Sequence, residues 1–273
     1  MPEGPEIRLA ADEIANAIVG KPTVEVCFAF PQLKQYEPQL TGATVTAVDT
    51  FGKALLTRFD NDLNIYSHNQ LYGIWKIRKA YDYPDTKRQL RLAIHNETHS
   101  ALLYSASDIQ VLRDPEVDTH PFISKLGPDL LDPTTTVDQV AARFISKRFK
   151  RRGFPSLLLD QHFVAGLGNY LRTEALFVAR LWPKLRPIDC TPEQITALAK
   201  ACVELTRQSY QTRGLTVDLA LAERLKAQGE TRRQYRWWVF GRNDHPCRIC
   251  HTPIIKTELG GRRLYYCPTC QTA

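Results

Sequence analysis

CRICHTPIIKTELGGRRLYYCPTC (residues 247–270) places the tightest constraint on how this chain folds. Cys247 and Cys250 are separated by two residues, as are Cys267 and Cys270, and sixteen residues separate the two pairs. This spacing is typical of a closed, structural zinc site with four thiolate ligands. Four unligated thiols are the less favoured alternative. Because a glycine pair divides the intervening residues, we expect a β-hairpin held by one Zn²⁺ ion.

The composition sets broader limits. The chain has 273 residues, of which 43% are hydrophobic, enough for roughly two domains with sizeable cores. Its net charge of +7 favours a polyanionic partner such as nucleic acid. The longest apolar runs are too short to cross a membrane, and the N-terminus lacks the layout of a secretory signal. The three cysteines outside residues 247–270 are scattered singly, which favours a reducing compartment. Together these observations predict a cytoplasmic protein that binds no membrane.

The order of sequence patterns predicts an α+β multidomain protein. An amphipathic helix at the N-terminus is followed by many short β-rich runs between Thr23 and Leu112, which favour an antiparallel sandwich or barrel. The stretch HPFISKLGPDLLDP (120–133) is rich in proline and indicates a boundary before a helical region. The predicted domains are a β-sandwich (1–124), a linker (125–136), a helical domain (137–236) and a zinc finger (237–273).

Two capping boxes open helices in the middle region: Thr136 with Gln139, and Thr191 with Gln194. Between them, residues 155–181 predict an apolar helix, a break at two glycines and a second helix. Residues 213–236 are highly charged, and their pattern fits a short helix, a mobile loop or both.

The glycine break AGLGNY (165–170) suits a backbone that turns tightly at a helix N-terminus, where amide groups attract phosphate. An ordinary packing turn between helices fits the spacing equally well. In FGKALL (51–56), Lys53 stands on a tight turn between strands. A lysine in that position is usually a solvated charge, and a functional role requires partners.

The N-terminal stretch MPEGPEI (1–7) places carboxylates beside a proline. If Met1 is removed, the nitrogen of Pro2 becomes a secondary amine with Glu3 next to it. The alternative is that Pro2 and Pro5 simply begin a helix, because proline suits the first helical turn.

In chain order, MPEGPEI, GKALL, SHNQLYG, LLLDQ-x-FVAGLGNYLR-x-E and RRLYYCPTCQ resemble the formamidopyrimidine-DNA glycosylase/endonuclease VIII family of bifunctional DNA repair enzymes. The resemblance extends over nearly the whole chain. It implies a catalytic β-sandwich domain, a helix–two-turns–helix DNA-binding domain and a zinc finger. It also implies a DNA glycosylase and AP lyase of base excision repair that acts as a monomer on damaged double-stranded DNA, using one zinc ion.

The resemblance also implies catalytic roles. Pro2, exposed by loss of Met1, matches the amine that attacks the deoxyribose C1′ and forms an iminium ion. Glu3 matches the carboxylate that opens the sugar ring and transfers protons, and Glu6 supports the site. Lys53 matches a lysine that contacts phosphate and assists elimination.

Further positions match residues that contact DNA. Asn169 and Arg262 match the pair that holds the phosphates around the extruded nucleotide. Arg262 is chosen over Arg263 because it lies five residues before Cys267. Lys125 matches another basic DNA contact.

Gln70, Leu71 and Tyr72 supply an amide, an apolar wedge and a ring for the space that the extruded nucleotide leaves. Without the resemblance, a hydrophobic strand edge would be the preferred interpretation. This wedge and Gly4 favour the endonuclease VIII branch and oxidised pyrimidines such as thymine glycol. The only methionine is Met1, so the chain has no wedge methionine of the purine-preferring type.

Two alternatives remain: a formamidopyrimidine-type enzyme for oxidised purines, and a non-enzymatic zinc-finger DNA-binding protein. Residues 214–238 are longer than the endonuclease VIII pattern and lie where the family places a loop near the damaged base. Base preference is therefore the least constrained expectation.

Overall fold

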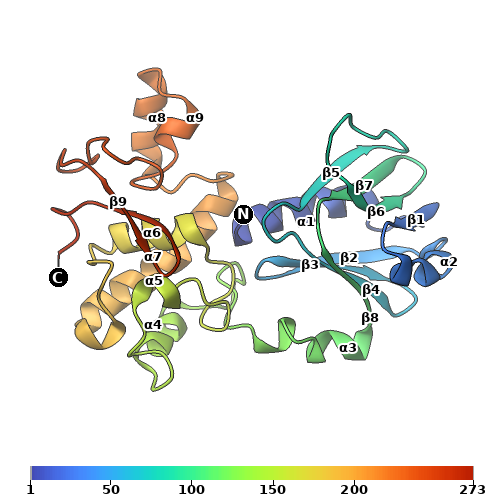
Figure 1. Ribbon diagram of the computed structural model, residues 1–273, viewed down its shortest axis with the longest axis horizontal. Helices are drawn as coiled ribbons and strands as arrows, with labels where there is room; N and C mark the ends of the chain where they lie inside the picture. Colours follow the sequence, from blue (N-terminus) through green and yellow to red (C-terminus); the bar gives the residue numbers. More distant parts are fainter. Residues whose placement is uncertain (1, 273) are drawn as a thin grey trace. The chain divides into compact units, whose positions relative to one another are not determined.

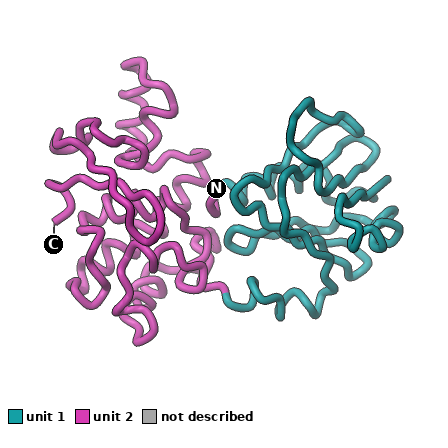
Figure 2. The backbone as a smooth tube through the Cα atoms, viewed as in Figure 1, with its two compact units in different colours: residues 1–2, 6–125 teal, residues 3–5, 126–273 magenta. Residues whose placement is uncertain are grey.

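A computed structural model of the protein describes residues 2–272. Within that range the backbone divides into two compact units (Figure 2). Pro2 and residues 6–125 form the first, and residues 3–5 and 126–272 form the second. Met1, whose removal the sequence predicts, lies outside the described residues. No helix in the described range is both long and apolar enough to span a membrane.

The first unit contains two antiparallel four-stranded sheets with strand orders β1-β6-β7-β5 and β2-β3-β4-β8 (Figure 1). Helix α1 (Gly4–Ile18) contributes Ile7, Ile14 and Ile18 to a core that both sheets share. The predicted β-sandwich with an N-terminal helix is therefore confirmed. The strands are β1 (Glu25–Phe28), β2 (Val45–Phe51), β3 (Ala54–Phe59), β4 (Leu63–His68), β5 (Ile74–Lys79), β6 (Leu90–His95), β7 (His99–Tyr104) and β8 (Asp108–Arg113).

Short helices in this unit have too few turns for an apolar period to be recognised from the sequence. A 3₁₀ helix (Pro31–Tyr36) and α2 (Glu37–Leu40) follow β1 and bury Leu33 and Leu40. Helix α3 (Asp114–Thr119) and a 3₁₀ turn (Ile123–Lys125) follow β8. They cover the outward-facing side chains of β3 and β4, such as Leu56 and Tyr66.

A buried histidine organises the connection between β5 and β6. The Nδ1 atom of His95 lies 2.6 Å from the Ser100 hydroxyl, and its Nε2 atom lies 3.0 Å from the Tyr83 hydroxyl. Tyr81 stacks on the imidazole ring with centroids 4.4 Å apart. These contacts hold residues 80–89, which we call the strap, on the outer face of the β1-β6-β7-β5 sheet.

The second unit is built on helices α4 (Val137–Ile145), α6 (Asn169–Val178) and α7 (Pro192–Gln211), which share one apolar core. Both predicted capping boxes are present, at Thr136 and at Thr191. The predicted apolar helix after residue 155 is wrong, because α5 (Phe154–Leu157) has a single turn. Side chains divert the backbone there: Asp160 accepts from the His162 amide and Gln161 from the Gly166 amide.

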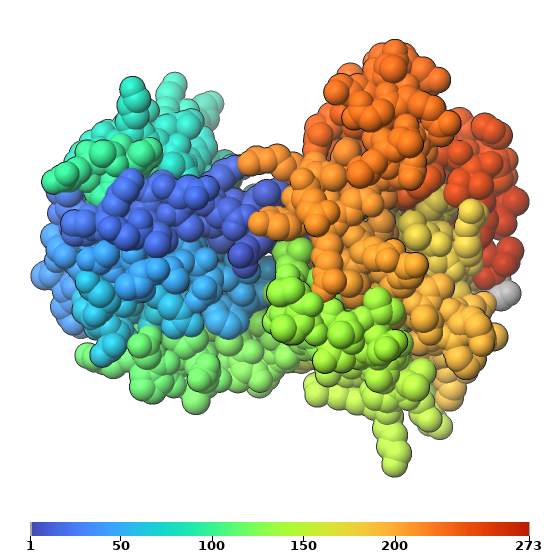
Figure 3. Space-filling model, turned by 180° about the vertical axis from the view of Figure 1, so that it is seen from behind, coloured from blue at the N-terminus to red at the C-terminus, as the bar shows by residue number. Residues whose placement is uncertain are grey.

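The charged segment 213–236 forms two short helices, α8 (Leu219–Ala227) and α9 (Arg232–Tyr235). Val217, Ala222 and Tyr235 form a small buried cluster between them. The side chain of Arg248 in the finger pairs with Glu230 at 2.9 Å. In the space-filling view, the α8–α9 pair (orange) accordingly packs beside the finger (red; Figure 3).

The finger contains the predicted hairpin, formed by β9 (Ile255–Leu259) and β10 (Arg262–Tyr266). Gly260 and Gly261 have φ values of 63° and 70°. Positive φ at both turn residues is what a two-residue hairpin loop requires, and glycine adopts it without steric cost.

We expect acidification to destabilise the first unit through His95. Burial lowers the pKa of His95 below its ordinary value of 6.5. Because the folded-state pKa is lowered, the neutral ring stabilises the fold fully above about pH 6.5. This contribution is lost as the pH falls through the folded-state pKa. Calorimetry between about pH 7 and pH 5 should therefore show a falling melting temperature. His95→Gln should be less stable at neutral pH but should lose less on acidification; an equally steep loss would exclude His95 as its source.

Candidate active site

Glu3 occupies the N-terminus of helix α6. Its side chain is 2% exposed, and its carboxylate accepts three backbone hydrogen bonds. The donors are the amides of Gly168 (2.8 Å), Tyr170 (2.8 Å) and Leu171 (3.2 Å). A helix N-terminus favours such an anion because its first amides have no helical partner and carry partial positive charge. The glycine break thus receives a carboxylate of the chain itself, where the sequence suggested an external phosphate.

Two glycines make this approach possible. A Cβ atom on Gly168 would lie 2.3 Å from the carboxyl carbon of Glu3, which no real side chain tolerates. The Gly4 amide donates to the Gly166 carbonyl at 2.8 Å, and a Cβ on Gly4 would lie 2.8 Å from the Gly166 Cα. A larger residue at either position would move Glu3.

The other predicted catalytic residues lie in the first unit. Pro2 is half-buried immediately before α1, and Glu6 stands in the first turn of that helix. Lys53, on the turn between β2 and β3, is only 5% exposed, so it is not the solvated charge that its position alone suggested. Its charge helps to lower the pKa of His68, behind the larger effect of burial.

The predicted phosphate-binding residues Asn169 and Arg262 are joined through the hairpin. The side-chain amide of Asn169 donates to the Arg263 carbonyl at 2.9 Å. Arg172, which is fully buried, donates to the side-chain oxygen of Asn169 at 3.1 Å and to the Arg262 carbonyl at 3.2 Å. The side chains of Arg262 and Arg263 are both exposed. The α6 N-terminus therefore fixes the backbone from which the two arginines project.

Sequence reasoning missed two charged residues of α6. Burial lowers the pKa of Arg172 to about 10, with Arg262 contributing, so it stays charged at neutral pH. Glu174 is fully buried and accepts from the amides of Trp238 (2.7 Å), Val239 (2.9 Å) and Phe240 (2.8 Å). The available signal was an arginine and a glutamate within an otherwise apolar run, since buried charges need partners.

The four finger cysteines fit a zinc ion. Their sulfur atoms all lie within 4.8 Å of one another; Cys247 and Cys270 are 3.8 Å apart, and Cys250 and Cys267 are 3.4 Å apart. Four sulfurs about 2.3 Å from one zinc ion form a tetrahedron with edges of about 3.8 Å. The predicted single structural zinc ion is thus confirmed, and the four thiolates leave no ligand position for water.

The wedge residues Gln70, Leu71 and Tyr72 form the turn between β4 and β5 in the first unit (Figure 1). Leu71 is 55% exposed and Tyr72 is 67% exposed, unusual values for adjacent large apolar side chains. Lys125, at the end of the first unit, is exposed.

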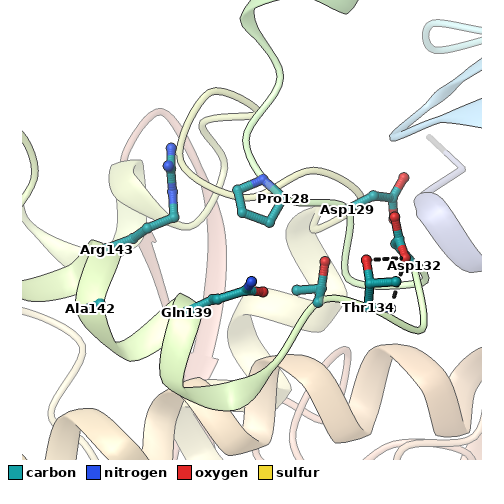
Figure 4. A pocket seen from close by; sticks show the side chains of 8 residues that line it. Pro128, Asp129, Asp132, Thr134, Gln139, Ala142 and Arg143 are labelled. Carbon is teal, nitrogen blue, oxygen red and sulfur yellow. Dashed lines mark hydrogen bonds between the residues drawn. The ribbon is translucent and has the colours of Figure 1, made fainter.

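A hollow of about 510 Å³ lies between residues 128–135 and α4 (Figure 4). Its two acidic side chains stabilise local turns: Asp129 accepts a hydrogen bond from the Leu131 amide, and Asp132 accepts one from the Thr134 amide. Hydrogen bonds from Thr134 hold the pKa of Asp132 below its usual range. No predicted site residue lines this hollow.

Comparison with known proteins identifies the family of this chain. Residues 1–107 match the formamidopyrimidine-DNA glycosylase N-terminal domain, 126–220 match the H2TH domain of the same glycosylase, and 244–273 match a zinc finger found in FPG and IleRS. The chain belongs to the formamidopyrimidine-DNA glycosylase family. It is 49% identical to Endonuclease 8 of Shigella sonnei (strain Ss046) and of Escherichia coli (strain K12 / DH10B), over 99% of this chain and 100% of each relative.

Solved structures share the family fold. The Lactococcus lactis Fpg protein in complex with N7-benzyl-Fapy-dG DNA matches with a TM-score of 0.83 at 21% identity. MutM in complex with carbocyclic 8-oxo-G DNA matches with a TM-score of 0.82 at 20% identity. Both alignments cover 100% of each chain.

Removal of the metal should disorder the finger and with it the arginine-bearing hairpin. Cys267→Ser removes one of four thiolates, so we expect zinc content to fall and duplex binding to drop by at least about tenfold, the loss of one or more charge-assisted contacts. Atomic absorption and fluorescence anisotropy measure the two effects. Cys202→Ser, at a buried thiol outside the finger, is the control. Full DNA affinity in the zinc-free protein would contradict this role.

Proposed function

We propose that this chain is a bifunctional DNA glycosylase and AP lyase of base excision repair, with the amine of Pro2 as nucleophile and Glu3 as its acid/base partner. The activity follows from membership of the family and from 49% identity to Endonuclease 8 over the whole length. The proposed roles rest on one observation above all. The carboxylate next to Pro2 in the chain is fixed by three backbone amides.

The proposed reaction begins when the Pro2 nitrogen attacks C1′ of the damaged nucleotide. The bond from C1′ to the base breaks, and the base leaves with that electron pair and takes up a proton. Glu3 takes the proton that the Pro2 nitrogen loses and passes it to the ring oxygen as the bond from C1′ to that oxygen opens, which leaves an iminium ion. A positioned acid of this kind contributes about 10²–10⁴-fold in rate.

Strand cleavage follows from the iminium ion, which acidifies the protons at C2′. Loss of one proton expels the 3′ phosphate by β-elimination, and a second elimination expels the 5′ phosphate. Lys53 is the proposed phosphate contact for these steps. Water then hydrolyses the iminium and releases the enzyme.

Contacts to phosphate position the duplex without selecting sequence. Asn169 and Arg262 are the proposed grip on the phosphates around the extruded nucleotide, and Lys125 is a proposed further contact. We propose oxidised pyrimidines as the substrates, supported by the wedge and by Gly4, whose missing Cβ lets it pack on Gly166.

A preference for oxidised purines is the second candidate, because the fold also occurs in the Fpg and MutM structures named above. Duplexes carrying thymine glycol or 8-oxoguanine distinguish the two. We further propose that the protein acts as a monomer and that it is cytoplasmic. Its seven cysteines, all free of disulfide bonds, agree with a reducing compartment.

The decisive test is covalent trapping. Borohydride reduces an iminium to a stable amine, so incubation with a thymine glycol duplex should give a protein–DNA adduct. Peptide mapping should place it on the mature N-terminal proline. An adduct on Lys53 would overturn the assignment, and an intact mass that includes Met1 would exclude Pro2 as nucleophile.

Glu3→Gln should separate the two activities. Glutamine keeps the shape but cannot supply a proton, so single-turnover excision of thymine glycol should fall by about two orders of magnitude or more. A preformed abasic site already opens to an aldehyde, which Pro2 can attack unaided, so cleavage there should largely survive. Equal losses on both substrates would mean that Glu3 acts on the elimination step or on the architecture.

A further inference from the structure

One backbone hydrogen bond closes the wedge turn. The Gly73 amide donates to the Asn69 carbonyl at 2.7 Å, and Gln70 adopts a φ of 49°. A Cβ on Gly73 would lie 2.5 Å from the Asn69 oxygen, so only glycine closes the turn. A non-glycine residue at positive φ persists only where its surroundings hold it.

Three hydrogen bonds hold this turn from outside. The Gln70 amide donates to Nδ1 of His68 at 2.9 Å, and the Ser107 hydroxyl donates to Oε1 of Gln70 at 2.6 Å. Nη1 of Arg88 donates to the Tyr72 carbonyl at 2.6 Å. The donors and acceptors come from β4, from the connection before β8 and from the strap.

The strap that carries Arg88 is held to the sheet near both of its ends. The strap is bonded to the sheet through the Tyr81 amide, which donates to Ser100 at 2.8 Å, and through Tyr83 on the buried His95. Its far end is fixed because the Ser105 amide donates to the Gln89 carbonyl at 2.8 Å. The guanidinium of Arg88 therefore reaches the wedge from an anchored segment.

The contact with Ser107 also orients the amide of Gln70. Because Oε1 accepts from the hydroxyl, the NH₂ group is left to donate. Every base pair offers acceptor atoms in the minor groove. The side chain of Gln70 also borders a hollow of about 360 Å³ beside His68, Asp108 and Phe122, so close packing does not fix its orientation. The hydrogen bond from Ser107 does.

We infer that Ser107 and Arg88 are positioning residues that preorganise the Gln70-Leu71-Tyr72 wedge before it enters a duplex. This inference rests on the proposed function, because it assumes that the wedge replaces an extruded nucleotide. An unclamped wedge must be ordered during binding, and ordering a flexible side chain reduces affinity by about two- to tenfold. The contacts from Ser107 and Arg88 order the wedge when the protein folds, so this cost is not incurred when DNA binds.

The test uses single-turnover excision of thymine glycol from a fully paired duplex and from the same lesion within a small unpaired bubble. Ser107→Ala and Arg88→Ala should each lower excision from the duplex by about three- to tenfold, the effect of ordering one or two side chains. In the bubble the nucleotide is already unstacked, so both variants should match the wild type. Equal losses on the two substrates would overturn the inference.

Matched variants separate positioning from other roles. Arg78→Ala removes the same charge from an exposed arginine on β5, whose guanidinium donates to the neighbouring Ile77 carbonyl, and it should change neither substrate. Ser107→Thr keeps the hydroxyl and should restore duplex excision. If Arg88 instead contacted phosphate, its loss would lower the salt slope of binding by about one unit, and that result would contradict a positioning role.

A double-mutant cycle tests whether Ser107 acts through Gln70. In a Gln70→Ala background, Ser107→Ala should have no further effect, because its partner is gone. Additive losses would reject the coupling. These outcomes are distinct from failure of the proposed function, which would appear as absence of excision and of borohydride trapping in the wild-type protein.

Discussion

The hydrogen bonds between the Glu3 carboxylate and the backbone amides at the N-terminus of α6 are the constraint on which the site depends. They join residues more than 160 positions apart in sequence. The helix supplies amides that need an acceptor, and the carboxylate needs donors once it is buried. Each satisfies the other, and the absence of a side chain at Gly168 lets them meet. A catalytic assignment for Glu3 therefore agrees with its structural position, since the group is held in one orientation before any substrate arrives.

Helix α6 also fixes the backbone of the finger. Asn169 and Arg172 in its first turn donate to carbonyl groups at the start of β10, and Glu174 further along accepts from the amides that lead into the finger. Phe177 packs against the finger's small core with Val239. A domain too small to have a large core of its own is stabilised by zinc and by this helix. The arginines of the hairpin are thus exposed side chains on a fixed backbone.

Much of this architecture could be predicted because it is encoded locally. The cysteine spacing, the capping boxes at Thr136 and Thr191 and the alternation in the strands each act over a few residues. Contacts between distant segments could not be predicted in this way. Neither the partner of Glu3, nor the buried ties of Arg172 and Glu174, nor the burial of Lys53 leaves a periodic signal. The α8–α9 segment was ambiguous because its high charge masks the few apolar residues, such as Val217 and Tyr235, that fix it. The predicted domain boundaries and the roles of the individual site residues stay predictions.

The anchoring of Glu3 also sets the length of the chain's free end. In the proposed mechanism Met1 is removed, and Glu3 is then the residue directly after the one that carries the terminal nitrogen. A fully extended residue spans at most about 3.6 Å. One extra residue between Pro2 and Glu3 would displace the amine by a comparable distance, far outside the roughly 0.5 Å within which reacting groups must be held. In the proposed mechanism, the position of the nucleophile is therefore set by an internal reference point, and an inserted residue would move it out of reach.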